Sequence, residues 1–125
     1  MRQEVASVPQ KEETELMLES YQRGEFIEAE RCAARLVADF PKHNVAWKIL
    51  AIVWMSDGKI DKAMSAAENA VDINPGDPVS QNIIGLAQQR SGFFQCAIES
   101  FKKSTMMDPH FAEPHNNLGN VSQDL

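Results

Sequence analysis

Several features that would point to particular functions are missing from this chain of 125 residues. Its longest strongly apolar stretch, residues 49–55, is too short to cross a membrane. Lysine and arginine do not cluster, and the net charge is −6, which disfavours binding to nucleic acid because that binding neutralises phosphates with grouped basic side chains. We therefore expect neither a membrane nor a nucleic acid as the partner.

Cysteine is scarce as well. The two cysteines, Cys32 and Cys96, occupy different places in the sequence pattern described below, which argues against a disulfide between them. The first nine residues lack the apolar segment of a secretion signal. Both observations are typical of a reducing compartment, so we expect two structural thiols and a cytoplasmic location.

Residues arranged for catalysis are also missing. The three histidines, His43, His110 and His115, have no cysteine or histidine partner at the spacing of a zinc site. There is no glycine-rich phosphate loop and no Gly-x-Ser-x-Gly nucleophile motif. The sequence therefore predicts no enzymatic activity, no cofactor and no metal site.

What the chain does contain is a repeat with a period of 34 residues. Three residue types recur at this interval: Gly24, Gly58 and Gly92; Ala29, Ala63 and Ala97; Pro41, Pro75 and Pro109. Such a period is typical of helix-turn-helix solenoids, in which each unit buries its apolar face against its neighbours. The repeat therefore predicts the fold more firmly than the function.

Each recurring residue has a physical reason to recur. Glycine ends a first helix in the left-handed conformation, alanine allows paired helices to approach closely, and proline follows a second helix. Asp77 before Pro78 is typical of a helix N-cap. We predict an all-α solenoid of seven helices, preceded by a flexible tail at residues 1–9. The expected helices are residues 11–23, 26–39, 44–57, 60–73, 78–91, 94–107 and 112–124.

Further residues recur in the same register, and the whole pattern resembles the tetratricopeptide repeat (TPR) family. Its columns include Leu16, Leu50, Ile84 and Leu118, then Phe26, Ile60 and Phe94, with Trp47 and Phe101 at their own family positions. The resemblance covers residues 10–125. It implies a right-handed superhelix of three full repeats, at residues 10–43, 44–77 and 78–111, followed by the first helix of a fourth at 112–125.

The resemblance also implies a binding surface, because the first helices of TPR units line a concave groove. The groove positions are the second, fifth, ninth, twelfth and thirteenth of each unit. On this chain the predicted partner-binding residues are Leu18, Tyr21, Lys48, Ile52, Met55, Asn82, Leu86, Gln89, Arg90, Asn116, Asn117 and Asn120.

An apolar floor between polar walls suits a peptide or helical segment of a protein partner. We expect Lys48 and Arg90 to be candidates for holding a carboxylate of such a guest. The alternative is structural: Leu18, Ile52 and Leu86 pack against adjacent first helices, or the N-terminal tail covers them.

Two specialised types of TPR domain have characteristic residues at their groove positions. Domains that capture the acidic C-termini of heat-shock chaperones use a clamp of lysine, asparagine and arginine. The clamp positions here hold other residues, namely Thr14, Leu18, Ile49, Val79 and Ile83. A chaperone adaptor of that type is therefore not expected.

The second type precedes enzyme domains, such as sulfotransferases and glycosyltransferases of the O-linked N-acetylglucosamine type. Asn117 stands where the latter use an asparagine to hold the peptide backbone, but Glu15, Ile49 and Ile83 occupy the corresponding earlier positions. We predict a protein-interaction scaffold; the alternative is the N-terminal recruiting or oligomerising arm of a longer enzyme. Self-association through the end helices is a third option. The polar last helix is consistent with a cap that keeps the array soluble or with an array that is cut short.

Overall fold

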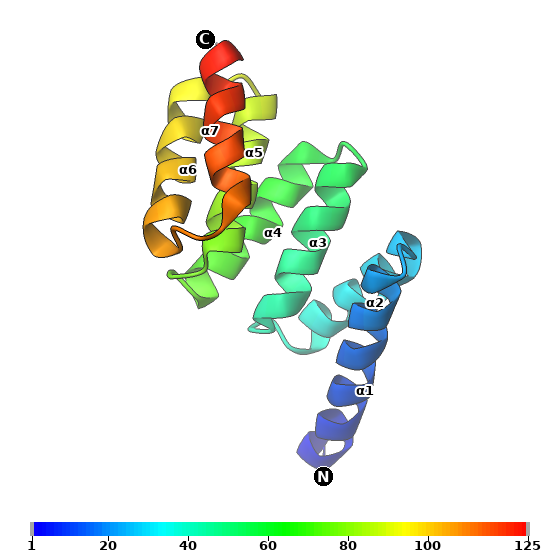
Figure 1. Cartoon of the computed structure of the whole chain (residues 1–125). Coiled ribbons are helices and arrows are strands. Elements are labelled where there is room, and N and C mark those ends of the chain that lie inside the picture. Colours follow the sequence, from blue (N-terminus) through cyan, green and yellow to red (C-terminus); the bar gives the residue numbers. More distant parts are fainter. Residues whose placement is uncertain (1, 125) are drawn as a thin grey trace.

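The computed structural model describes residues 2–124, with side chains from residue 10 onward, and this part of the chain is helical apart from short turns (Figure 1). The described residues form seven helices, which confirms the predicted all-α solenoid. They are α1 (Arg2–Gln22), α2 (Phe26–Asp39), α3 (Asn44–Ser56), α4 (Ile60–Ile73), α5 (Pro78–Arg90), α6 (Phe94–Met107) and α7 (Ala112–Asp124).

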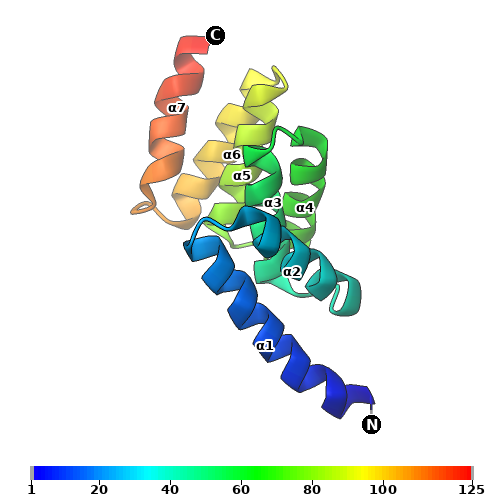
Figure 2. The same ribbon diagram turned by 90° about the vertical axis from the view of Figure 1, so that its right-hand side faces the viewer.

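Each helix packs against the next along the chain, and the two ends of the chain lie at opposite ends of the array (Figures 1 and 2). The odd-numbered helices also contact one another in order, from α1 to α3, α5 and α7. Between residues 2 and 124 no such contact joins one even-numbered helix to another. The odd-numbered helices therefore form the inner, concave side of the array and the even-numbered helices the outer side.

The three repeating glycines end α1, α3 and α5 in the predicted conformation. Gly24, Gly58 and Gly92 have φ values of 78°, 79° and 87°. The amide after each glycine donates to the carbonyl five residues earlier, over 2.8 Å in all three repeats. This pattern is the Schellman motif, which satisfies carbonyls at a helix C-terminus.

The helix pairs are closed by matched small and large residues. The three repeating alanines are fully buried. In the third repeat, the ring of Phe101 packs so closely on Gly85 that a Cβ added to the glycine would lie 2.5 Å from the ring. In the first repeat the sizes are exchanged: Met17 holds the position of Gly85 and Ala33 that of Phe101, and both are buried. The second repeat has a buried alanine at both positions, so the register fixes which positions meet but neither one residue type nor one joint volume.

The predicted N-terminal boundary is wrong. The first helix begins at Arg2, not at residue 11, so it includes residues 2–9, which we expected to form a tail. The repeat pattern covers residues 10–125 and gave no indication of a helix before them, and Pro9 lacks the N–H that a helix interior uses. The segment around it contains no glycine and several good helix formers, and the backbone continues as a helix through the proline.

Candidate functional site

The concave side of the array contains a pocket of about 230 Å³ between α3 and α5, with contributions from α1 and α7. All four odd-numbered helices therefore meet at this pocket. Its apolar lining is Tyr21, Ile52, Met55, Val79, Ile83 and Leu86. Its polar and charged lining is Ser56, Asn82, Arg90 and Glu113.

Half of the residues predicted for the groove line this pocket, and the other half lie elsewhere. Those at the pocket are Tyr21, Ile52, Met55, Asn82, Leu86 and Arg90. Leu18 lies outside the lining and packs against the main core cluster, as Ile52 and Leu86 also do, and Asn116 and Asn120 are exposed on α7. The remaining three, Lys48, Gln89 and Asn117, bond to other residues of the chain.

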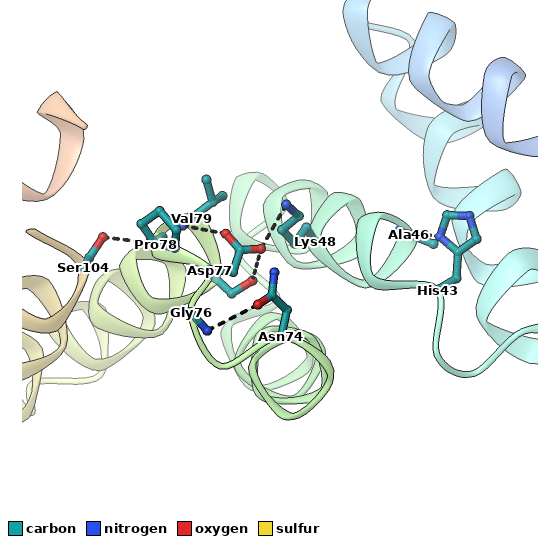
Figure 3. Close-up of polar contacts among 10 residues, drawn as sticks. His43, Ala46, Lys48, Asn74, Gly76, Asp77, Pro78, Val79 and Ser104 are labelled. Carbon is teal, nitrogen blue, oxygen red and sulfur yellow. Dashed lines mark hydrogen bonds and ion pairs between the residues drawn. The ribbon is translucent and has the colours of Figure 1, made fainter. Parts of the chain in front are cut away.

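Lys48, a predicted groove residue, is paired with an acidic side chain of the same chain. Its Nζ lies 2.9 Å from Oδ2 of Asp77, the residue that caps α5 (Figure 3). The same carboxylate accepts hydrogen bonds from the Val79 amide, at 3.0 Å, and from the Ser80 hydroxyl, at 3.2 Å. The ion pair joins α3 to the N-terminus of α5, so Lys48 has a structural role in the folded chain.

The environment of Asp77 favours its charged form. Burial on its own would raise the pKa of this carboxyl group, but the hydrogen bond and the charge of Lys48 lower it. The bonds from Val79 and Ser80 act in the same direction, and the pKa is held below its ordinary value of 3.8. Asp77 is therefore an ionised helix cap with Lys48 as its counter-ion. Its place before Pro78 predicted the cap but not the counter-ion.

Polar side chains also connect α7 to α5. Asn82 is buried, its amide donates to Oε2 of Glu113 over 3.2 Å, and its oxygen accepts from Asn117 over 3.0 Å. Further along, Gln89 donates to Asp124 over 2.8 Å. Asn117 and Gln89 are thus used to dock α7, and Asn82 reaches the pocket with both of its polar groups already bonded.

Arg90 marks one end of the pocket. Its Nη1 donates to the carbonyl oxygen of Met55 over 3.0 Å, which ties the C-terminus of α5 to that of α3. The residue is exposed, and a guanidinium has five N–H donors. Tyr21 lies at the same end, where its ring is held beside Phe26 with 5.8 Å between the ring centroids. Arg90 therefore keeps donors for a guest after its structural bond is made.

Sequence reasoning missed four lining residues that are not in the predicted set: Ser56, Val79, Ile83 and Glu113. The signal for three of them was present. Val79 and Glu113 stand at the second position of their units and Ser56 at the thirteenth, and both are groove positions in the TPR pattern. Ile83 stands at the sixth position, for which the pattern gave no signal.

His43 links the first repeat to the second. Its Nδ1 accepts a hydrogen bond from the Ala46 amide over 3.1 Å and so caps α3. Because Nδ1 is an acceptor, the proton of the neutral ring is on Nε2, which donates to Thr14 Oγ1 over 2.9 Å. Thr14 in turn donates to the carbonyl of Gln10 over 2.7 Å. Burial lowers the pKa of His43 below its ordinary value of 6.5, which favours this neutral form.

His115 and Trp47 have the same role at equivalent positions of their units. Trp47 Nε1 donates to the carbonyl of Pro41 over 2.8 Å, and His115 Nε2 lies 3.0 Å from the carbonyl of Pro109. Both side chains thus fix the turn before their own helix. His115 stands at the tryptophan position of its unit, and this hydrogen bond gives it a structural role.

The remaining reactive side chains do not assemble into a site. Burial, with smaller effects from Glu13 and Glu28, raises the pKa of the Cys32 thiol to about 11, and Cys96 is a free, exposed thiol. No group of three or more histidine, cysteine or acidic residues suited to a metal ion occurs in the part of the chain that the structure describes. Within the same residues, no helix is both long and apolar enough to cross a membrane.

A larger hollow of about 750 Å³ lies at the other end of the array, on α1 and α2. Leu16, in its lining, is 41% exposed, whereas Leu50, at the same position of the second repeat, is 1% exposed. The difference arises because α2 covers the side of α3 that carries Leu50, while no described helix covers the side of α1 that carries Leu16. This hollow is therefore an open stacking surface of the array, and the concave pocket is the better candidate for a site.

Solved structures with similar folds are numerous. The first TPR domain of Spaghetti (RPAP3), bound to an HSP90 peptide, superposes with a TM-score of 0.86 at 20% identity, over 94% of each chain. The TPR2B domain of yeast Sti1, in complex with an Hsp70 peptide, gives a TM-score of 0.85 at 14% identity, over 95% of this chain and 100% of that one.

A region of an enzyme is similar too. The O-GlcNAc transferase of Thermobaculum terrenum matches with a TM-score of 0.86 at 20% identity, over 92% of this chain but 22% of that one. No protein-family model matches the sequence, and no curated protein matches it either. At these identities the likeness concerns the fold, which is that of a TPR domain.

Proposed function

We propose that this chain, which has the tetratricopeptide-repeat fold, is a protein-interaction module that binds a peptide segment of a partner in its concave pocket and catalyses no reaction itself. The observation that carries the proposal is the pocket formed jointly by four inner helices, with an apolar floor and a few polar groups at its edge. Grooves of this composition suit peptide segments with apolar anchors.

The size of the pocket supports a peptide rather than a small molecule. Sites that enclose a drug-sized ligand measure roughly 300–1,000 Å³, whereas this one is about 230 Å³, which suits one or two side chains. Two of the similar TPR domains were solved with bound peptides. Because the chaperone-clamp positions hold Thr14, Leu18, Ile49, Val79 and Ile83, we propose a partner other than an acidic chaperone C-terminus.

The test is a change of the pocket floor with a matched control. The double variant Ile52→Asp and Leu86→Asp places two charges in the pocket, and Ile27→Asp with Met106→Asp places two charges on residues that are 88% and 81% exposed and lie outside it. Both variants and the unchanged chain are first compared by circular dichroism, and each is then used to sort a displayed library of random peptides.

We expect peptides that bind the unchanged chain and the Ile27/Met106 variant but not the Ile52/Leu86 variant. If the Ile52/Leu86 variant remains helical and binds the same peptides equally well, the pocket is not the binding site and the proposal fails. A cytoplasmic location belongs to the same proposal, since it rests on the two free cysteines, Cys32 and Cys96. The recruiting arm of a longer enzyme remains the second candidate, supported by the similarity to the glycosyltransferase region.

A further inference from the structure

The concave pocket has a charge of opposite sign at each end. Arg90 and Glu113 are the charged residues in its lining among the residues described. Arg90 lies at the C-terminus of α5, and Glu113 lies in the first turn of α7, where its carboxylate is held by the amide of Asn82. Neither forms an ion pair with a described residue.

The distance between the two charges follows from the geometry of α5. Glu113 is bonded to Asn82, and Asn82 precedes Arg90 by eight residues on the same helix. At a rise of 1.5 Å per residue, the two ends of the pocket are about 12 Å apart along the helix axis. Each charge also has capacity for a guest: Arg90 has donors beyond its bond to Met55, and Glu113 has a second carboxylate oxygen.

The lining between these ends is apolar. Ile52 of α3 and Ile83 and Leu86 of α5 lie in the stretch between Asn82 and Arg90. An acidic group of a guest would therefore be stabilised at Arg90, a basic group at Glu113, and an apolar side chain between them.

We propose that the pocket selects an extended peptide segment in which an acidic and a basic residue are separated by three positions, with an apolar residue midway between them. In an extended chain, side chains at alternate positions point to the same face, and residues i and i+4 are about 13 Å apart. The acidic, apolar and basic side chains at i, i+2 and i+4 thus face the pocket together, at the spacing of Arg90 and Glu113. This inference rests on the proposed peptide-binding function and adds the chemistry of the guest.

The proposal differs from a clamp for two carboxylates. Lys48, the other cation expected at the groove, is paired with Asp77, so the pocket has one cationic end and one anionic end. Both charges are near the surface, where an ion pair is worth up to about 1 kcal/mol and is screened by salt. We therefore expect the reversal of either charge to weaken binding by about three- to tenfold.

The experiment uses two sets of reagents. Peptides are selected from a random displayed library on the unchanged chain, and their affinities are measured for Arg90→Glu, for Glu113→Lys and for a control pair on the outer helix α6, Lys102→Glu and Glu99→Lys. A synthetic nine-residue peptide, acetylated and amidated, carries glutamate, leucine and lysine at its third, fifth and seventh positions and serine elsewhere. Two companion peptides carry two glutamates or two lysines in place of the mixed pair. They measure the charge requirement on the unchanged chain. The test therefore stands even if Arg90→Glu, which loses a bond to Met55, fails to fold.

The selected peptides should be enriched in the acidic, apolar, basic pattern, in either chain direction. They should bind more weakly to Arg90→Glu and to Glu113→Lys, and their binding to the control pair should be unchanged. The mixed-charge peptide should bind more tightly than either companion. Peptides that depend on Ile52 and Leu86 but show no charge pattern overturn this inference and leave the peptide-binding function standing. Peptides that place the two charges seven or eight residues apart, as a helix would, have the same consequence. Absence of any peptide that depends on Ile52 and Leu86 overturns both.

Discussion

At the scale of single residues, the repeat register decides which side chains the fold accepts. The eighth position of the unit holds Gly85 in the third repeat and Gly119 in the fourth, yet their surroundings differ. A Cβ on Gly85 would lie 2.5 Å from the buried ring of Phe101, whereas a Cβ on Gly119 would meet nothing within 4 Å. The same substitution at the two glycines should therefore have opposite effects.

We predict that Gly85→Ala lowers the free energy of unfolding by about 1–3 kcal/mol, because the added methyl group overpacks a closed joint. Gly119→Ala should raise the free energy of unfolding by about 0.5–1 kcal/mol, since alanine is the better helix former and has room. Urea denaturation of both variants provides the measurement. Equal effects of the two substitutions would show that Phe101 and Gly85 do not pack as described.

His43 gives a second prediction at this scale, which concerns pH. Its pKa is lowered in the folded chain from 6.5, so below pH 6.5 the unfolded chain takes up a proton that the folded chain resists, and stability falls as pH falls through the folded pKa. Asparagine is also a good N-cap but does not titrate. As the pH falls from 7 to 5, the stability of His43→Asn should therefore improve relative to that of the unchanged chain. A difference that stays constant over this range would mean that His43 is not held neutral.

At the scale of elements, one ion pair joins α3 to the start of α5. Lys48 and Asp77 are 29 positions apart in the sequence, and the carboxylate caps α5 while it holds the lysine of α3. The sequence predicted the cap, because Asp-Pro at a helix start is a local signal. It did not predict the partner, because no local pattern indicates which lysine lies nearby. Helix ends were predictable for the same reason: glycine and proline act locally.

We predict that Lys48→Met lowers the free energy of unfolding at pH 7 by about 1–3 kcal/mol, because it leaves the buried Asp77 charge without its cation. The wild-type pKa of Asp77 lies below 3.8, so its stabilising contribution is present above that pH and is lost as the pH falls through the folded pKa. In the Lys48→Met variant the charge of Lys48 no longer opposes the effect of burial, so the pKa of Asp77 rises. Protonation of Asp77 at low pH then removes the cost of the buried, unpaired charge.

The gap between the two proteins should thus be widest at neutral pH and should narrow below pH 4. Chemical denaturation across this range measures the gap, and a gap that does not change with pH would contradict the ion pair. Asp77→Asn serves as the control, because the same Lys48→Met change in that background should show little pH dependence.

At the scale of the whole molecule, the array is not uniformly packed. One core cluster of buried residues spans α1 to α5, and a smaller one, formed by Ala97, Phe101 and Val121, holds α7 to α6. The contacts between α5 and α7 include three polar side-chain bonds, among them Asn117 to Asn82 and Gln89 to Asp124. Solenoid repeats contact mainly their neighbours, so their local stabilities can differ.

We predict that Val121→Ala weakens the attachment of α7 by about 1–3 kcal/mol, because it removes two methyl groups from a fully buried site. Amide hydrogen exchange should then accelerate in α7 while α3 and α4 remain protected. Ser122→Ala, at an exposed neighbouring position, is the matched control. Uniform acceleration along the chain would show that the array unfolds as a single cooperative unit.

The sequence also predicted the location of the concave surface, because a repeat register carries the inner positions from unit to unit. Tyr21, Ile52 and Leu86 line the pocket as the register indicated. The register did not predict which polar groups remain available to a guest. Asn117 bonds to α5 and Gln89 bonds to α7, through contacts between repeats. Those contacts depend on the spacing of helices in space, which a 34-residue pattern does not specify.

Binding of a peptide between α3 and α5 can be followed by NMR. A peptide from the library selection is added to the labelled full chain, and the methyl resonances are recorded. Ile52, Ile83 and Leu86 report on the pocket, and Ile27 and Met106 on the surface outside it. Peptide binding in the pocket should shift the methyl resonances of Ile52, Ile83 and Leu86 and leave those of Ile27 and Met106 unchanged. Shifts confined to Ile27 or Met106 would contradict binding in the pocket.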